Sequence, residues 1–226
     1  MTKVKVCGLM KRKDIDICIK AGVDVLGFVV EYPSPVPWNL TIEQGKELIN
    51  WVPSHLTTCV VTGGAGRLDK VLEIADQLKP TVVQLHHRET LQEVREISRR
   101  LQSRGIKTVK ALRIDKQGNC DFDIPDPVLA AWELAKTDLW AILVDSYTED
   151  RPGGTGVPVD LPVFRKIQQS TSMPVILAGG LTPANVSAVI GATQPYAVDV
   201  LTGVEQEPGI KNPDKVLNFV RAVVNA

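Results

Sequence analysis

Short apolar runs alternate with amphipathic stretches along the whole chain, and most of the runs stop at a glycine or a polar residue. Several of the runs are continuously apolar, which is typical of parallel strands that are covered on both faces. The pattern predicts eight strands, at residues 3–7, 25–30, 57–61, 82–86, 107–113, 139–145, 174–178 and 197–201.

The stretches between these runs carry apolar residues at helical spacing, and several have cap signals at their ends. Thr41 is a candidate N-cap, and Gly22 is a helix stop. The spacing predicts helices near residues 13–21, 41–51, 68–75, 89–101, 128–135, 161–169 and 214–224, with Thr182-Pro183 opening one more. Strands that alternate with helices favour right-handed crossovers and closure into a (βα)8 TIM barrel.

A doubly wound open sheet is the structural competitor, but no Gly-x-Gly-x-x-Gly turn follows the first strand. The length of 226 residues suits one barrel, so we expect residues 1–226 to form a single (βα)8 domain. Residues 31–39 contain three prolines and are expected as a loop. Residues 146–159 are expected as a glycine-rich loop, and the polar segment 115–127 is the least predictable part of the chain.

The charge balance makes some partners improbable. Lys and Arg total 26 and so do Asp and Glu, so no basic field indicates a nucleic acid or an anionic membrane surface. No apolar run approaches the roughly 18 residues of a spanning helix, and the N-terminus enters a strand rather than a signal peptide. We expect a cytoplasmic protein that acts on a small metabolite. The four cysteines are scattered without metal spacing, so we expect reduced thiols and no metal.

Two apolar runs late in the chain, residues 174–181 and 197–205, end abruptly in small residues and glycine. In a barrel the loops after the last two strands form the usual phosphate site, where backbone N–H groups and a helix N-terminus hold the anion. Either turn alone is as well explained by an ordinary βα connection, whereas the pair favours a phosphorylated substrate. The candidate phosphate-binding residues are Gly154, Gly179, Gly180, Thr202 and Gly203.

Polar side chains at the C-terminal ends of barrel strands face the active site. This criterion selects Cys7, His86, Arg113, Asp145 and Asp199. Cys7 alone is more often a packed apolar thiol. Asp145 ends a strongly apolar run, so it needs a hydrogen-bond partner or a chemical role. Asp199 is assigned by a small margin to a structural role, for example beside Lys5.

Several motifs, in this order, resemble phosphoribosylanthranilate isomerase. They are Lys5-Val6-Cys7-Gly8-Leu9, Gly27-Phe28, Val83-Gln84-Leu85-His86, Asp145 with Gly153-Gly154-Thr155-Gly156, Leu177-Ala178-Gly179-Gly180-Leu181-Thr182-Pro183-Ala184-Asn185-Val186, Val198-Asp199-Val200, Gly203-Val204-Glu205 and Pro208-Gly209-Ile210-Lys211. They cover the chain from the first strand to the last loop, and they are specific together rather than singly.

The resemblance implies a (βα)8 barrel that isomerises N-(5-phosphoribosyl)anthranilate in tryptophan biosynthesis without a cofactor, as a monomer or homodimer. By position, Cys7 is similar to the family's general base and Asp145 to its general acid. Such an Amadori rearrangement needs an acid for the ring oxygen and a base for the adjacent carbon. We expect His86, Arg113, Asp199 and Trp38 to contact the substrate.

The chain departs from the family pattern at the end that meets the anthranilate. The loop after the second strand, residues 34–39, contains no arginine, although the family normally has a basic residue there. His87, Leu201-Thr202 and residues 62–66 also differ from the usual residues. We expect residues 32–39 to lie over the barrel mouth with Trp38 stacking on an aromatic ring, and Arg113 or Arg88 to supply the missing charge.

Two alternatives to this isomerase stay open. One is a diverged relative that acts on another phosphoribosyl amine, which the altered loop favours. The other is a non-catalytic barrel that only binds a sugar phosphate. The presence of both Cys7 and Asp145 argues against simple binding, because binding alone requires neither side chain.

Overall fold

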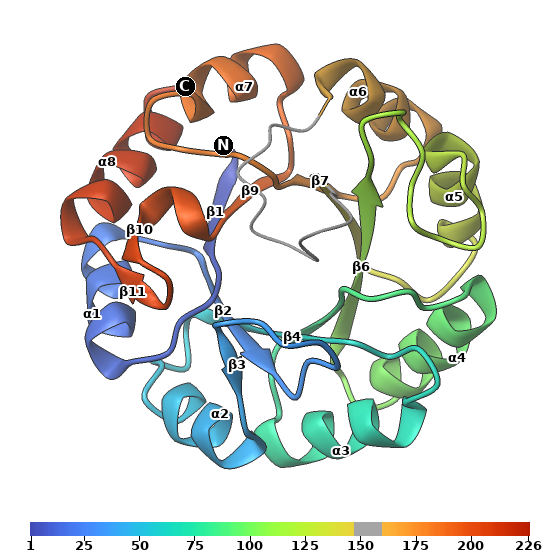
Figure 1. The fold of residues 1–226 in the computed structure, drawn as a ribbon, viewed down its shortest axis with the longest axis horizontal. Helices are drawn as coiled ribbons and strands as arrows, with labels where there is room; N and C mark the ends of the chain where they lie inside the picture. The colour runs from blue at the N-terminus through green and yellow to red at the C-terminus, as the bar shows by residue number, and fades with distance from the viewer. Residues whose placement is uncertain (147–159) are drawn as a thin grey trace.

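A computed structural model describes residues 1–146 and 160–226, and it shows a closed barrel (Figure 1). Each neighbouring pair of strands around the barrel is parallel, and β1 pairs with both β9 and β2, which closes the ring. The (βα)8 TIM barrel expected from the sequence is confirmed. The barrel strands, in sequence order, are β1 (Lys3–Val6), β2 (Val25–Val30), β4 (Thr57–Thr62), β5 (Val82–Leu85), β6 (Lys107–Ile114), β7 (Ala141–Ser146), β8 (Val175–Leu177) and β9 (Ala197–Val200).

Helices surround the strands as an outer ring (Figure 1). They are α1 (Arg12–Ala21), α2 (Ile42–Ile49), α3 (Leu68–Leu78), α4 (Leu91–Gln102), α5 (Pro127–Leu134), α6 (Leu161–Ser170), α7 (Val186–Thr193) and α8 (Pro213–Val224). Thr41 caps α2 as expected, because its hydroxyl accepts from the N–H of Gln44 in a capping box. The α7 helix begins later than Thr182-Pro183 predicted. The Asn185 side chain accepts from the N–H of Thr182 and donates to the carbonyl of Gly180, which stabilises a turn ahead of the helix.

Two apolar layers hold this architecture together. The larger layer fills the space between strands and helices and includes Phe28, Phe164 and Phe219, each fully buried. The smaller layer lies inside the barrel, where the inward positions include Cys7, Val61 and Leu143. Alternation of side chains along each strand sends one set outward and the other into the barrel. The inner set sits beneath the C-terminal strand ends and forms the base of the site described below.

Two short pairings were not expected from the sequence. The proline-containing stretch 31–39 ends in β3 (Asn39–Leu40), which pairs with Val29 and Val30 of β2. The Asn39 side chain bonds to both the N–H and the carbonyl of Tyr32, so it closes the intervening loop. Beyond β9, a 3₁₀ turn (Thr202–Val204) leads into the hairpin of β10 (Glu205–Glu207) and β11 (Ile210–Lys211).

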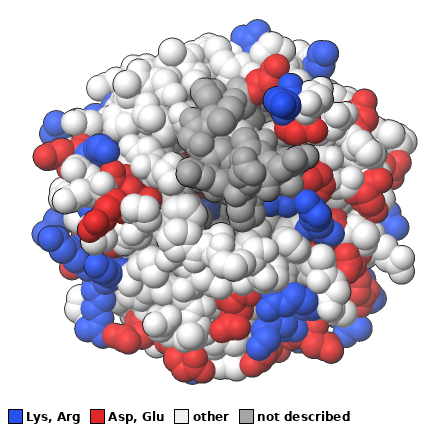
Figure 2. Space-filling view, viewed as in Figure 1, with Lys and Arg blue, Asp and Glu red and all other residues white. Residues whose placement is uncertain are grey.

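The surface of the described residues carries both signs of charge. On the face shown in Figure 2, lysine and arginine are intermixed with aspartate and glutamate around the periphery. Within the described ranges, no helix has the length and apolar character needed to cross a membrane. The four cysteines are buried and form no disulfide.

Candidate active site

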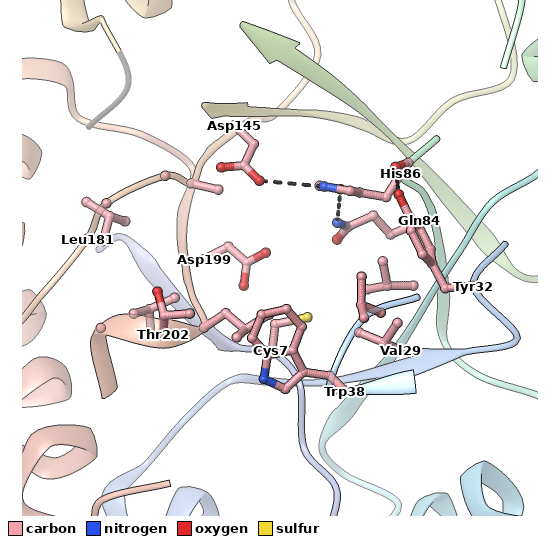
Figure 3. A pocket seen from close by; sticks show the side chains of 18 residues that line it. Cys7, Val29, Tyr32, Trp38, Gln84, His86, Asp145, Leu181, Asp199 and Thr202 are labelled. Carbon is pink, nitrogen blue, oxygen red and sulfur yellow. Dashed lines mark hydrogen bonds and ion pairs between the residues drawn. The ribbon is translucent and has the colours of Figure 1, made fainter. Parts of the chain in front are cut away.

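A pocket opens at the C-terminal end of the barrel (Figure 3). Of the candidate residues, it is lined by Cys7, Trp38, His86, Asp145, Gly179, Gly180, Asp199, Thr202 and Gly203. The side chains that could supply acid and base chemistry therefore meet the glycine turns in one cavity. Gly154 lies outside the described residues. Asp145 and Cys7 project from opposite sides of the pocket, with Asp199 between them (Figure 3).

Asp145, in β7, is the titratable group whose environment best suits proton donation. It is 9% exposed, and burial raises the pKa of this carboxyl from 3.8 to about 7, although the N–H of Ser146 donates to it at 2.8 Å and opposes the shift. A side chain at Gly179 would lie 3.1 Å from the Oδ1 atom of Asp145. Glycine at that position leaves room for the carboxyl. Near neutral pH, Asp145 is thus present in both protonated and ionised forms.

Cys7 follows β1 and is 5% exposed. Burial raises the pKa of its thiol, while the nearby Lys5 ammonium acts in the opposite direction. A Cβ atom at Gly27 of β2 would lie 2.9 Å from the Cys7 sulfur, so glycine at 27 gives the thiol its space. Lys5 is therefore the group that favours a thiolate inside this apolar barrel.

Asp199 of β9 forms a buried ion pair with Lys5, with Nζ and Oδ2 2.7 Å apart. The expected pairing of these two residues is confirmed. Burial would lower the pKa of Lys5, but the Asp199 carboxylate, together with Cys7 and Cys59, more than offsets burial and raises it, so Lys5 stays charged. The Oδ1 atom of Asp199 is buried and has no hydrogen-bond partner within residues 1–146 and 160–226. Because Asp199 also lines the pocket, this oxygen can accept a hydrogen bond from a bound hydroxyl group.

His86 lies beside Asp145, with His86 Nε2 3.6 Å from Asp145 Oδ2. Burial, followed by the charges of Arg113 and Lys110, lowers the pKa of His86 well below 6.5, so its ring is neutral and this contact is no ion pair. The amide nitrogen of Gln84 lies 3.1 Å from His86 Nδ1, and the Tyr32 hydroxyl donates to the His86 carbonyl at 2.7 Å. These contacts fix the orientation of the imidazole.

Gln84 and Tyr32 line the pocket although neither was a predicted site residue, and Tyr32 was expected only as part of the segment 32–39 over the barrel mouth. A signal for Gln84 was available, because it lies two residues before His86 and strand alternation sends both to the same face. The signal for Tyr32 was weaker, since a tyrosine in a proline-containing loop has no fixed direction until the loop closes.

The glycine turns after β8 and β9 approach each other closely. Gly179 and Gly180 adopt φ values of 89° and 62°, which favour glycine. A Cβ atom at Gly203 would lie 1.9 Å from the carbonyl oxygen of Leu181, so the loops touch backbone to backbone. Both turns line the pocket. Their geometry agrees with the anion-binding role predicted for them, which stays a prediction.

We expect Gly203→Ala to weaken binding of ribulose 5-phosphate by about tenfold to a hundredfold, the effect of losing one hydrogen bond to a charged group. The added methyl must push the two loops apart. Calorimetric titration measures the effect. Gly191→Ala is the matched control, because a Cβ atom there meets nothing within 4 Å. Unchanged affinity in Gly203→Ala would place the phosphate elsewhere.

Arg113 lies beside the described wall of the pocket rather than in it. Its side chain is buried in β6 and forms an ion pair with Asp121, with Nε and Oδ1 3.1 Å apart, and it is absent from the described pocket wall. Arg88 reaches the same Asp121 at 4.0 Å and is mostly exposed. Asp121 belongs to the segment that the sequence left unpredicted. The position of Arg113 supports anchoring of that segment, and the substrate contact expected for Arg113 stays a prediction.

Trp38 lies in the pocket wall, as expected for the loop after β2. Its side chain is buried, and the indole N–H donates to Glu205 at 2.9 Å. Among the described residues of the wall there is no lysine or arginine side chain. Beside Trp38, the wall includes Val29, Tyr32 and Val36, so an aromatic group bound there would meet apolar and aromatic surface.

Comparisons with known proteins agree on one family. Residues 4–222 match the family described as N-(5′-phosphoribosyl)anthranilate (PRA) isomerase. The N-(5′-phosphoribosyl)anthranilate isomerase of Natronomonas pharaonis is 36% identical over 222 residues, which cover 98% of each chain. The crystal structure of phosphoribosyl anthranilate isomerase from Thermotoga maritima superposes with a TM-score of 0.82 at 26% identity and covers 100% of each chain.

A second solved structure shows such an enzyme with a ligand. It is phosphoribosyl anthranilate isomerase in complex with reduced 1-(o-carboxyphenylamino)-1-deoxyribulose 5-phosphate, with a TM-score of 0.79, 25% identity and 100% coverage of each chain. The family indicated by the sequence motifs is thus confirmed over nearly the whole length. The chain belongs to the N-(5′-phosphoribosyl)anthranilate isomerase family.

Proposed function

We propose that this protein catalyses the Amadori rearrangement of N-(5′-phosphoribosyl)anthranilate to 1-(2-carboxyphenylamino)-1-deoxyribulose 5-phosphate. The observation that carries the proposal is the placement of Asp145 and Cys7 on opposite sides of one pocket that also contains the paired glycine turns. The family match and the relative solved with a reduced product analogue support the same substrate.

Asp145 acts as the general acid in this proposal. Its proton passes to the ring oxygen of the ribose, the bond between that oxygen and C1 breaks, and the nitrogen lone pair forms an iminium ion. A carboxyl group whose pKa is about 7 can be protonated at neutral pH and still release its proton readily. Neutral His86, 3.6 Å away, adds no positive charge that would force Asp145 to ionise.

Cys7 acts as the general base. Its thiolate removes the proton from C2, and the electrons of that C–H bond neutralise the iminium to give an enolamine that tautomerises to the ketone. Asp145 has lost one proton and Cys7 has gained one, so the pair is ready again after a single proton exchange. Carbon 1 is reduced and carbon 2 oxidised within the same molecule, which is why we propose a reaction that needs no cofactor.

The remaining residues position the sugar phosphate. We propose that backbone N–H groups around Gly180 and Gly203 hold the phosphate, and that the unpartnered Oδ1 atom of Asp199 accepts from a ribose hydroxyl. Holding both ends of the ribulose chain places the reacting carbons between acid and base, which lowers the entropic cost of reaching the transition state.

The proposed roles predict the pH dependence. The active form carries a proton on Asp145 and none on Cys7, so the pair holds one proton in total. The pair holds one proton at pH values between the pKa of Asp145 and the pKa of Cys7. We therefore expect kcat/KM to rise as the pH increases through about 7 and to fall above the raised pKa of the Cys7 thiol. The limb near pH 7 should vanish in Asp145→Asn. A wild-type rate that only falls as pH passes 7 would contradict this order of the two pKa values and would mean that the Cys7 thiol ionises at a lower pH than Asp145.

Growth of a tryptophan auxotroph that lacks the isomerase tests the function directly. We expect the wild-type gene to restore growth without tryptophan, and the purified protein to convert N-(5′-phosphoribosyl)anthranilate. Asp145→Asn is the negative control. Failure in both assays by a folded protein would overturn the proposal.

A diverged member that prefers another phosphoribosyl amine is the second candidate. It is favoured by one observation: the loop after β2, residues 34–39, contains no lysine or arginine that could pair with the anthranilate carboxylate. Trp38→Arg restores a cation to the loop after β2. A gain in kcat/KM for the anthranilate substrate would support the second candidate, and an unchanged kcat/KM would support the first.

A further inference from the structure

The indole of Trp38 forms part of the pocket wall and packs directly on the backbone of Gly8, next to Cys7. A Cβ atom at Gly8, where φ is 73°, would lie 3.0 Å from Cδ1 of Trp38 and 3.2 Å from Cγ of Leu201. Trp38 is only 8% exposed, so its indole is wedged between the turn after β1 and the loop after β9. Any movement of this ring would change the width of the pocket next to the thiol (Figure 3).

Glu205 holds this ring from outside the pocket. Its Oε1 atom accepts three hydrogen bonds, from Trp38 Nε1 at 2.9 Å, Lys211 Nζ at 2.9 Å and the Gly209 N–H at 3.1 Å. Glu205 is 6% exposed, and a buried carboxylate is costly unless it is paired in this way. Trp38 and Glu205 are 167 residues apart in sequence. The carboxylate therefore joins the loop after β2 to the hairpin after β9.

The same cluster reaches the glycine turns. Lys211, whose side chain is fully buried, also donates to the carbonyl of Leu201 at 3.2 Å. Leu201 comes directly before Thr202 and Gly203, which line the pocket. The N–H of Lys211 donates to Asp14 of α1, so the hairpin is also tied to the outer ring. Glu205 thus links two sides of the pocket. Its carboxylate accepts hydrogen bonds from Trp38 in the aromatic wall and from Lys211, which in turn contacts the loop expected to hold phosphate.

We propose that Glu205 is a positioning residue that fixes the indole of Trp38 as the surface on which the aromatic ring of the substrate packs. The inference rests on the proposed function. A tryptophan ring can turn about two side-chain torsions, and the bond from Nε1 to a carboxylate selects one orientation. Without that bond, only packing against its neighbours holds the ring in this orientation. Glu205 acts on the substrate through Trp38 and touches none of the reacting atoms.

The test compares two ligands that share a phosphate and differ in the aromatic ring. One is reduced 1-(o-carboxyphenylamino)-1-deoxyribulose 5-phosphate, and the other is ribulose 5-phosphate. The dissociation constant for ribulose 5-phosphate divided by that for the reduced product analogue isolates the aromatic wall, because any change at the glycine turns affects both ligands. Trp38→Phe keeps a ring and removes the N–H donor, while Glu205→Ala removes the acceptor. Glu207→Gln, an exposed change on the same hairpin, is the matched control.

We expect Trp38→Phe and Glu205→Ala each to reduce the ratio by about tenfold, the effect of losing one hydrogen bond to a charged group. Glu205→Gln should recover most of it, because an amide oxygen can still accept from the indole. The double variant should lose no more than the worse single variant, since both changes break the same contact. The proposal would be overturned by an unchanged ratio of dissociation constants in the single variants or by additive losses in the double variant. It would also be overturned if Glu205→Gln and Glu205→Ala reduced the ratio equally.

Hydrogen exchange of the indole N–H gives a readout that does not depend on turnover. In the wild type, the Trp38 indole proton should exchange more slowly than that of Trp51, which also bonds to a carboxylate but is 47% exposed. The difference should disappear in Glu205→Ala, and equal exchange in the wild type would refute the contact. Trp38→Phe leaves the Glu205–Lys211 pair in place. The ratio of the two dissociation constants in this variant therefore tests the role of the indole N–H even if Glu205→Ala fails to fold. A wild type that binds the aromatic ligand without converting substrate would refute the proposed function alone.

Discussion

Asp145→Asn is expected to lower kcat by roughly 10²–10⁴-fold, which is the usual contribution of a positioned general acid. The amide is nearly the same shape as the carboxyl group and can still accept from the N–H of Ser146. It cannot deliver a proton, however, so the ring oxygen must leave as an alkoxide. Affinity for the reduced product analogue should change little, because that ligand needs no proton transfer to bind.

The measurement is steady-state kcat together with calorimetric affinity on the same preparation. Asp214→Asn, at the exposed first turn of α8, is the matched control and should behave like the wild type. A loss of affinity equal to the loss of kcat would show that Asp145 binds the substrate rather than protonating it. A nearly normal kcat would mean that another group opens the ribose ring.

Cys7→Ser is expected to reduce kcat on a similar scale, roughly 10²–10⁴-fold. A serine hydroxyl is far harder to deprotonate than a thiol, and Lys5 cannot compensate for that difference in a site where burial already disfavours the anion. The substitution removes little volume, so the barrel interior should remain packed. Reaction of deuterated substrate at C2 should show a larger isotope effect in this variant, because proton removal becomes the slow step.

Cys59→Ser is the matched control for this second prediction. Cys59 is a buried thiol of the same barrel interior, in β4, but it does not line the described wall of the pocket. It should retain most of the wild-type rate. Full activity in Cys7→Ser would return Cys7 to a packing role, and an equal loss in both variants would indicate a general effect of polar atoms in the interior.

The architecture was accessible from the sequence because the signals for it are local. Apolar runs that end at a glycine or a polar residue predicted every barrel strand to within a few residues, for example β2, where Val25 and Val30 are the bounds in both. Strand ends then placed Cys7 and Asp145 at the same opening, since parallel strands bring their C-terminal ends to one side of a barrel. The family motifs required no coordinates either, and the comparisons bore them out.

The contacts that adjust the site were decided only in three dimensions. Arg113 pairs with Asp121, and Trp38 donates to Glu205, because each pair joins segments whose relative position depends on loop closure. The pKa of Asp145 likewise depends on how completely the strands and loops around it exclude water. The sequence by itself therefore determined the barrel, the family and the opening where the acid and the thiol meet. The tertiary structure determined which charged side chains are paired and which side chains of the pocket are held in place by hydrogen bonds. Long-range burial and hydrogen bonding leave no periodic pattern along the chain, so the sequence could not predict them.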